Sequence, residues 1–209
     1  MTFRILATLA LFVAPALAQT ATFTAIIEPA TQPSICQEET HLVACNGALL
    51  KSTTLDLNQY VGKPYRFTAK LGGVTCNVWN VTAVAGAPAT LTFCGSAAPG
   101  CPIRLRVGPS GVIGMWFLWW SPSSAFVPLD ATLGTLMLGA PAYSLGSGPT
   151  ATATPYFETV LPSSPALVGL TVFAQGARMD IGPVGPLQLT NPTCFTIAPF
   201  MPPCATPGC

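Results

Sequence analysis

Side chains capable of acid–base chemistry are few. His41 is the single histidine of the 209 residues, so no other side chain has an ordinary pKa close to neutrality. A carboxylate pair of the kind used in glycoside hydrolysis would have to come from three acidic residues that no spacing groups together, Asp130, Glu158 and Asp180. No G-x-S-x-G motif occurs. We therefore assign no catalytic residue, and a hydrolase of unknown type is the third of the functional alternatives.

Cysteine is the other residue type that could do chemistry. The eight cysteines include no C-x-x-C pair, and His41 has no second histidine with which to bind zinc, so we expect disulfides, no metal site and no cofactor. Five lie in the first half, Cys36, Cys45, Cys76, Cys94 and Cys101, and three lie near the end, Cys194, Cys204 and Cys209. Two odd groups cannot each pair internally, so complete pairing requires a bridge between them.

The shortest loops favour particular pairs. Cys36–Cys45 and Cys94–Cys101 would be the easiest local closures, and Cys76 would then pair with one of the three C-terminal cysteines. Eight cysteines allow 105 pairings, so the sequence does not determine the connectivity.

Tryptophan marks the strongest candidate binding residues. The segment 115–120 reads MWFLWW, and as a strand it puts Trp116 and Trp120 on one face and Trp119 on the other. Aromatic side chains on both faces favour a strand buried between two layers. The alternative is an exposed tryptophan face that stacks on sugar rings or docks a partner. The candidate binding residues are Trp116, Trp119, Trp120 and Trp79.

The N-terminus has the pattern of an export signal. Arg4 precedes an apolar run at residues 5–13, and Ala16-Leu17-Ala18 fits the small-x-small cleavage rule, which makes Gln19 the first mature residue. The run is too short for a membrane span. We expect a secreted, periplasmic or extracellular protein.

The composition limits the partners. Charged residues make up 7% of the chain, against about 25% in ordinary soluble domains. Of the eight basic residues Arg4 belongs to the leader, so seven basic residues balance seven acidic ones. A surface without net charge does not attract nucleic acid, and it favours self-association. An extracellular glycan or protein is the expected class of partner.

Turn residues divide the chain into short segments typical of β structure. The chain has 22 prolines and 19 glycines, and between them lie alternating or β-branched runs such as 65–71, 74–84 and 103–107. Residues 55–62 could form a single helical turn. We expect an all-β protein, stapled by disulfides.

The segment 55–84, LDLNQYVGKPYRFTAKLGGVTCNVWNVTAV, resembles the pattern of a small OB-type β-barrel, in which a leucine-rich turn and YVGK lead into a strand. The resemblance implies a barrel that binds oligonucleotides or sugars on a sheet face. Tyr65, Phe67 and Trp79 could stack bases. Because acidic neighbours cancel the nearby lysines, we expect a structural barrel without a nucleic-acid ligand.

The segment 161–192, which contains PALVGLTVFAQ and LTN, resembles a C-terminal β module of uncharacterised exported bacterial proteins. That resemblance extends over residues 103–198 and implies a bacterial source and no known activity. The expected organisation is a signal peptide at 1–18, an N-terminal segment at 19–35, an OB-like domain at 36–101, an antiparallel β-sandwich at 102–198 and a tail rich in proline and cysteine at 199–209.

The function expected first is a secreted, non-enzymatic structural or binding module, associated with the cell envelope or matrix. A carbohydrate-binding module that uses the tryptophan strand is the alternative.

Overall fold

The structure is a computed structural model, and it describes residues 19–31, 36, 39–72, 76–108, 113–150, 156–181, 187–199 and 204. The described residues form sixteen β-strands and two short 3₁₀ helices, η1 (Leu57–Tyr60) and η2 (Pro165–Leu167), and no α-helix. The predicted all-β, disulfide-stapled fold is confirmed. The OB-type detail stays a prediction.

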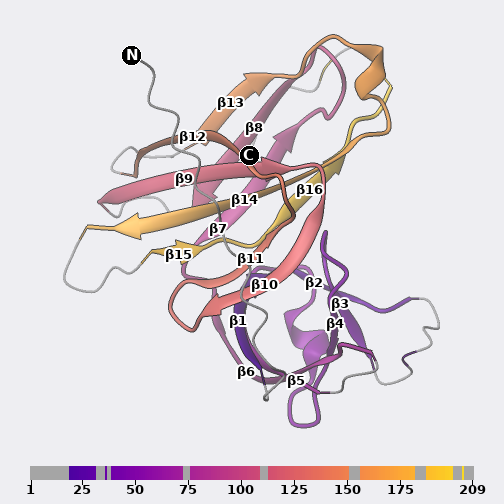
Figure 1. The fold of residues 1–209 in the computed structure, drawn as a ribbon, viewed down its shortest axis with the longest axis vertical. Coiled ribbons are helices and arrows are strands. Elements are labelled where there is room, and N and C mark those ends of the chain that lie inside the picture. The colour runs from indigo at the N-terminus through magenta and orange to yellow at the C-terminus, as the bar shows by residue number, and fades with distance from the viewer. Residues whose placement is uncertain are drawn as a thin grey trace.

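The N-terminal half forms a curled half-barrel, seen at the lower right of Figure 1. Its six-stranded sheet has the order β1–β5–β6–β4–β3–β2. The bounds are Thr20–Ala25 (β1), Ile27–Pro29 (β2), His41–Val43 (β3), Leu49–Lys51 (β4), Tyr65–Leu71 (β5) and Trp79–Gly86 (β6). Asp56 caps η1, because its carboxylate accepts a hydrogen bond from the Asn58 N–H at 3.1 Å.

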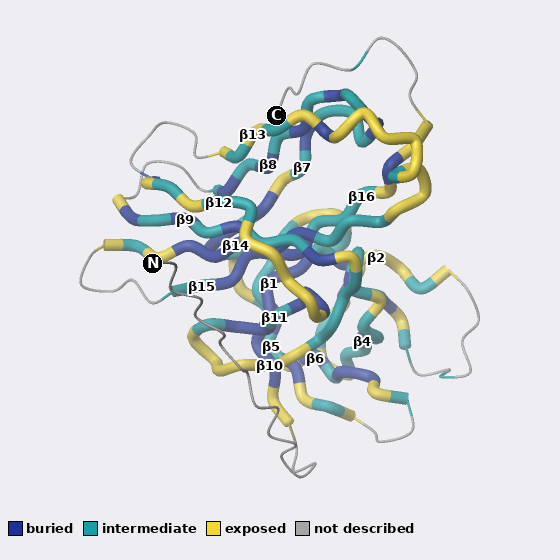
Figure 2. The backbone as a smooth tube through the Cα atoms, turned by 45° about the horizontal axis from the view of Figure 1, so that its top comes forward, coloured by how far each residue is buried: buried dark blue, intermediate teal, exposed yellow. Residues whose placement is uncertain are grey.

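The C-terminal half contains two facing sheets. One has the order β12–β9–β14–β15, with β16 also paired to β14, and the other has the order β13–β8–β7. The bounds are Thr90–Gly95 (β7), Pro102–Gly108 (β8), Gly114–Ser121 (β9), Tyr143–Pro149 (β12), Tyr156–Val160 (β13), Thr171–Asp180 (β14), Gln188–Leu189 (β15) and Thr193–Thr196 (β16). Leu105, Trp116 and Leu118 are buried between these sheets, and Figure 2 shows the buried stretch along β14.

One hairpin joins the two halves. Strands β10 (Ser124–Asp130) and β11 (Gly134–Leu138) pair only with each other, and they lie against β1 as well as β14 and β15 (Figure 1). Phe126 packs on Phe23 of β1 with ring centroids 5.2 Å apart, and Met137 is fully buried in the core of the half-barrel. The half-barrel therefore takes part of its core from the second half of the chain.

The expected boundary after residue 101 falls inside a sheet, because β7 and β8 pair along their whole length on either side of it. The segment 19–35, expected to be separate, contributes β1, which pairs with β5 from Thr20 opposite Lys70 to Ala25 opposite Tyr65. Strand β1 is buried over most of its length because it contacts both β5 and the hairpin.

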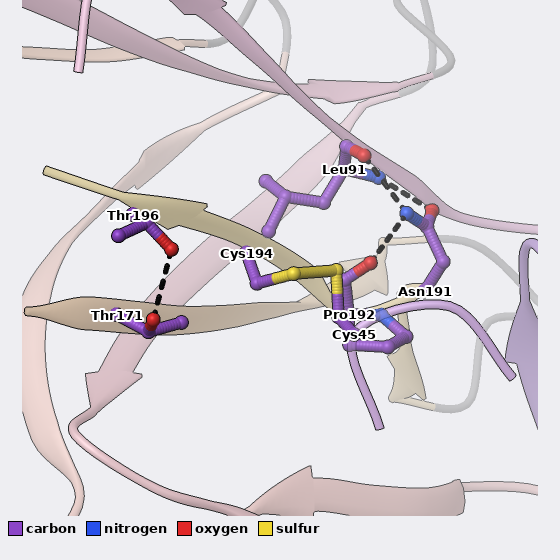
Figure 3. Close-up of a disulfide and its surroundings, with 7 residues drawn as sticks. All are labelled: Cys45, Leu91, Thr171, Asn191, Pro192, Cys194 and Thr196. Carbon is purple, nitrogen blue, oxygen red and sulfur yellow. Dashed lines mark hydrogen bonds between the residues drawn. A yellow bond between two sulfur atoms is a disulfide. The ribbon is translucent and has the colours of Figure 1, made fainter. Parts of the chain in front are cut away.

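Two buried side-chain amides take the place of strand pairing. The Gln175 side chain on β14 accepts a hydrogen bond from Met137 N–H at 2.8 Å and donates to the carbonyls of Thr135 and Thr190 at 3.0 Å each. The Asn191 side chain accepts from Leu91 N–H and donates to the Leu91 carbonyl, both at 2.9 Å (Figure 3). These amides give β11 and β7 the partners that an adjacent strand would supply.

Disulfides join the halves as well. Cys45 pairs with Cys194 beside Asn191 (Figure 3), Cys101 pairs with Cys204, and Cys36 pairs with Cys76. Cys94 is also disulfide-bonded. The expected bridge between the N-terminal and C-terminal groups is confirmed, and two such bridges are described.

The local pairs expected from the sequence are wrong. Cys94 lies opposite Arg104 in the β7–β8 register, so Cys101 comes three residues before the position that faces Cys94. Cys45 sits in the turn after β3, where it reaches Cys194 at a Cα–Cα distance of 5.5 Å. Cys76, expected to reach the tail, instead closes the loop before β6 by pairing with Cys36.

Gly148 provides a test of packing in the sandwich. A Cβ atom at this position would lie 3.0–3.1 Å from three atoms of the Trp116 indole, whereas a Cβ atom at Gly86 would meet nothing within 4 Å. We expect Gly148→Ala to lower the free energy of unfolding by about 1–3 kcal/mol, and Gly86→Ala to change it by less than about 1 kcal/mol. Urea denaturation with intact disulfides measures both, and equal effects would contradict the packing described.

Asn191 provides a test of the amide pairing. Asn191→Ala leaves the buried N–H and carbonyl of Leu91 without these partners, so we expect a loss of about 2–4 kcal/mol in the free energy of unfolding. The control is Asn58→Ala, which removes an exposed amide at η1 and should cost less than about 1 kcal/mol. A loss for Asn191→Ala no larger than the control's would show that the pairing does not stabilise β7.

His41 makes the stability depend on pH. The side chain is 3% exposed, and burial lowers its pKa from 6.5, although Asn58 and Asp56 act in the opposite direction. The folded state therefore prefers the neutral imidazole. The contribution of this preference to the free energy of unfolding is complete above pH ~6.5. It is lost as the pH falls through 6.5 toward the lower pKa that His41 has in the folded state. We expect His41→Gln to remove this part of the stability profile measured by denaturation between pH 5 and 8, and an unchanged profile would contradict the assignment.

Candidate functional site

An apolar cavity opens between the two sheets of the sandwich. Its volume is about 330 Å³, and its lining comes from β8, β9, β12, β13, β14 and β16 with the connection through η2. Ligand pockets begin at roughly 300 Å³, so the space suits a small molecule or part of one.

Strand alternation explains why the lining is apolar. Ile103 and Leu105 point inward from β8, and Phe157 and Thr159 point inward from β13, because every second residue of a strand faces the same side. Phe195 of β16 stacks on Phe93 of β7 with ring centroids 4.4 Å apart, which closes the space between the sheets beside the cavity.

Charged groups are kept out of the cavity by the same alternation. Arg104 and Glu158, the neighbours of the inward residues, form an ion pair of 2.7 Å, and the Arg104 guanidinium lies 4.3 Å from the centroid of the Tyr156 ring. Among the described residues no ionisable side chain lines the cavity, and Thr159 supplies the one hydroxyl. A charged group placed inside would lose its hydration without gaining a partner, so the cavity selects for uncharged apolar groups.

The cavity leads from an exposed rim to a buried floor. Val160 and Leu170 at the rim are 59% and 36% exposed, whereas Leu105 and Ala174 at the floor are almost inaccessible. Exposed apolar side chains around the opening of an apolar space are typical of a binding site. The arrangement can bind, and its lining in the described part of the chain offers no acid, base or nucleophile apart from the hydroxyl of Thr159.

The tryptophan strand contributes one residue to this cavity. Trp120 is half-buried, stacks on Tyr143 with ring centroids 5.1 Å apart, and lines the cavity. Trp116 is buried in the sandwich core, which agrees with the interpretation as a strand between layers. Trp119 lies on the opposite face and stacks on Phe117, with centroids 6.0 Å apart. Trp116 and Trp120 therefore face the interior of the sandwich, away from Trp119, and the three do not form one flat platform.

Trp79 lies in the other half of the molecule. It is 6% exposed, and its ring centroid is 5.0 Å from that of Phe126 on β10. The structure does not bring it together with the other three tryptophans. Binding by any of the four stays a prediction.

The three carboxylates considered for hydrolysis lie on different strands and have separate partners. Asp130 accepts hydrogen bonds from Thr132 and Leu133 N–H at 2.7 Å each, and the bond that it accepts from the Thr132 hydroxyl is the largest cause of its lowered pKa. Glu158 pairs with Arg104, and Asp180 pairs with Arg178. Buried His41 contacts the Thr40 hydroxyl at 2.9 Å. These residues do not assemble into a carboxylate pair.

Sequence reasoning missed most of the cavity. Leu145, Phe157 and Phe195 belong to short strands of which only β13 has a visible alternating pattern. A cavity is the volume that packed side chains fail to fill, and periodicity reports only which side of a strand is apolar.

Comparison with family models, with curated proteins and with solved structures finds no match for this chain. Among the described residues, no group of histidine, cysteine and acidic side chains could hold a metal ion, and no helix is long and apolar enough to cross a membrane.

Proposed function

We propose that this protein is a secreted, non-enzymatic binding protein, and that the cavity of its β-sandwich takes an uncharged apolar ligand. The observation that carries the proposal is the cavity itself, with its exposed apolar rim and a lining that is apolar throughout the described residues except for the Thr159 hydroxyl. The small volume favours a small molecule, or the apolar end of a larger one, over a folded partner.

Export is the second part of the proposal. The leader pattern at residues 1–18 supports it, and so do the three described disulfides, because such bonds persist in oxidising compartments. The resemblance of residues 103–198 to exported bacterial modules supports a bacterial source. An apolar ligand in an aqueous compartment needs a protein that shields it from water, which the space between two sheets provides.

N-phenyl-1-naphthylamine, an uncharged apolar dye that fluoresces when it leaves water, tests the proposal. We expect saturable binding to the wild-type protein. Val160→Asp should weaken binding at least about tenfold, because it places a charge at the rim of the cavity. The matched control Val127→Asp changes an exposed valine of β10 outside the cavity and should leave binding unchanged.

Two results would overturn the proposal. The first is no saturable binding of the dye by the folded wild-type protein. The second is equal loss of binding in the two valine variants, which would point to non-specific adsorption. Thermal unfolding of each variant shows that the comparison is made between folded proteins.

A further inference from the structure

Two Cys–Asn dipeptides have an unusual backbone. Cys45, which precedes Asn46, has φ 66°, and Asn77, which follows Cys76, has φ 48°. They are the two non-glycine residues with positive φ in the described part of the chain. Residues held in sparsely populated conformations cluster at functional sites, because the surrounding structure must maintain them.

Each dipeptide is fixed by its own disulfide. Cys45 is bonded to Cys194 and Cys76 to Cys36, so each asparagine directly follows a cysteine that a disulfide holds in place. The Asn46 turn is also closed by backbone hydrogen bonds, among them Gly47 N–H to the Val43 carbonyl at 2.8 Å. The backbone that carries both amides is therefore set before any ligand arrives.

Both asparagines line one cleft. It has a volume of about 450 Å³ and lies where the beginnings of β1, β6 and β10 meet the turn between β3 and β4. The lining residues with polar or aromatic side chains that could contact a ligand are Gln19, Asn46, Asn77, Trp79, Ser124 and Phe126. This cleft is separate from the sandwich cavity, with which it shares no lining residue.

The described side chains that line the cleft are all uncharged. Three side-chain amides and one hydroxyl can donate and accept hydrogen bonds, and no ionisable side chain is among the described residues that line the space. The Asn46 amide donates to the Ala125 carbonyl at 2.5 Å, which leaves its own oxygen as an acceptor. Asn77 is exposed, and its side chain makes no hydrogen bond with any described residue.

An aromatic wall completes the site. Trp79 and Phe126 pack on each other with ring centroids 5.0 Å apart and both line the cleft. Phe126 is half-buried and Trp79 is 6% exposed, so Phe126 offers most of the apolar surface beside the amides and Trp79 supports it from the core. A sugar ring likewise combines polar and apolar surfaces, with hydroxyl groups at its edge and C–H groups on its face. Amides match pairs of hydroxyl groups as donors and acceptors, and the described side chains of the cleft carry no charge that would favour an acidic or basic sugar.

We propose that this cleft binds a neutral carbohydrate, with Asn46 and Asn77 as its hydrogen-bonding residues and Trp79 and Phe126 as its apolar wall. The prior fixing of both dipeptides lowers the entropy lost on binding, because little of the backbone has to be ordered. The site does not depend on the proposed apolar ligand.

Asn77→Gly isolates the role of the amide. Glycine adopts positive φ without strain, so the variant removes the side chain and keeps the backbone. The matched control is Asn58→Gly, which removes an exposed amide at η1 outside the cleft. The probes are neutral oligosaccharides of glucose, mannose, xylose and N-acetylglucosamine, with oligogalacturonate as the acidic comparison. Calorimetric titration at up to about 10 mM sugar detects millimolar dissociation constants.

We expect at least one neutral oligosaccharide to bind, Asn77→Gly to weaken that binding at least about tenfold, and Asn58→Gly to leave it unchanged. Dye binding in the sandwich cavity should be the same in all three proteins, so the two proposals fail separately. The proposal is wrong if no neutral sugar binds, if oligogalacturonate binds more tightly than every neutral sugar, or if Asn77→Gly binds as the wild type does.

Discussion

The N–H and carbonyl groups at a buried strand edge need hydrogen-bond partners. Strand β11 has such an edge, because one side pairs with β10 and the other lies against β14 and β15 of the sandwich. The Gln175 side chain supplies the partners, because it accepts from Met137 and donates to Thr135. Thr135 in turn donates its hydroxyl hydrogen to the Thr22 carbonyl of β1 at 2.9 Å, and Leu189 N–H donates to the Leu133 carbonyl at 3.0 Å. Through these bonds the hairpin is attached to both halves. The core of the half-barrel, the cleft beside β10 and the position of the sandwich all depend on that attachment.

The disulfides reinforce the same arrangement across longer stretches of sequence. Cys45 and Cys194 are separated by 149 residues, and closing so long a loop removes about 5 kcal/mol of unfolded-state entropy in the chain-entropy model. Their bridge lies beside Asn191, which pairs with β7, and one residue before Asn46, which lines the amide cleft. One covalent bond thus supports the sheet that faces the sandwich cavity and the turn that forms the cleft.

Local patterns in the sequence predict the strands in which apolar and polar residues alternate clearly. They predict few of the residues that line the sandwich cavity and the cleft. Residues 65–71 and 103–107 become β5 and β8, and residues 55–62 contain η1. The alternation of β6 does not continue beyond Val81, since a bulge opposite Thr68 and Ala69 leaves Ala83 exposed and Val84 half-buried. The sequence does not predict strand β12, because its glycines interrupt any apolar pattern, and Gly148 is needed there to make room for Trp116. Both candidate sites combine segments far apart in the chain, and only the packing of complete sheets brings them together.

The hairpin also has a consequence for the order in which the chain can fold. Phe126 and Met137 belong to the half-barrel core, so that core cannot close until residue 138 has emerged during synthesis or transport. Cys36 and Cys45 emerge long before Cys194, the native partner of Cys45. Where thiols are oxidised as they emerge, the first two cysteines can join each other before either native partner of the pair is in place. Where that happens, native pairing depends on reshuffling of the first bond, which is the reaction that a disulfide isomerase catalyses.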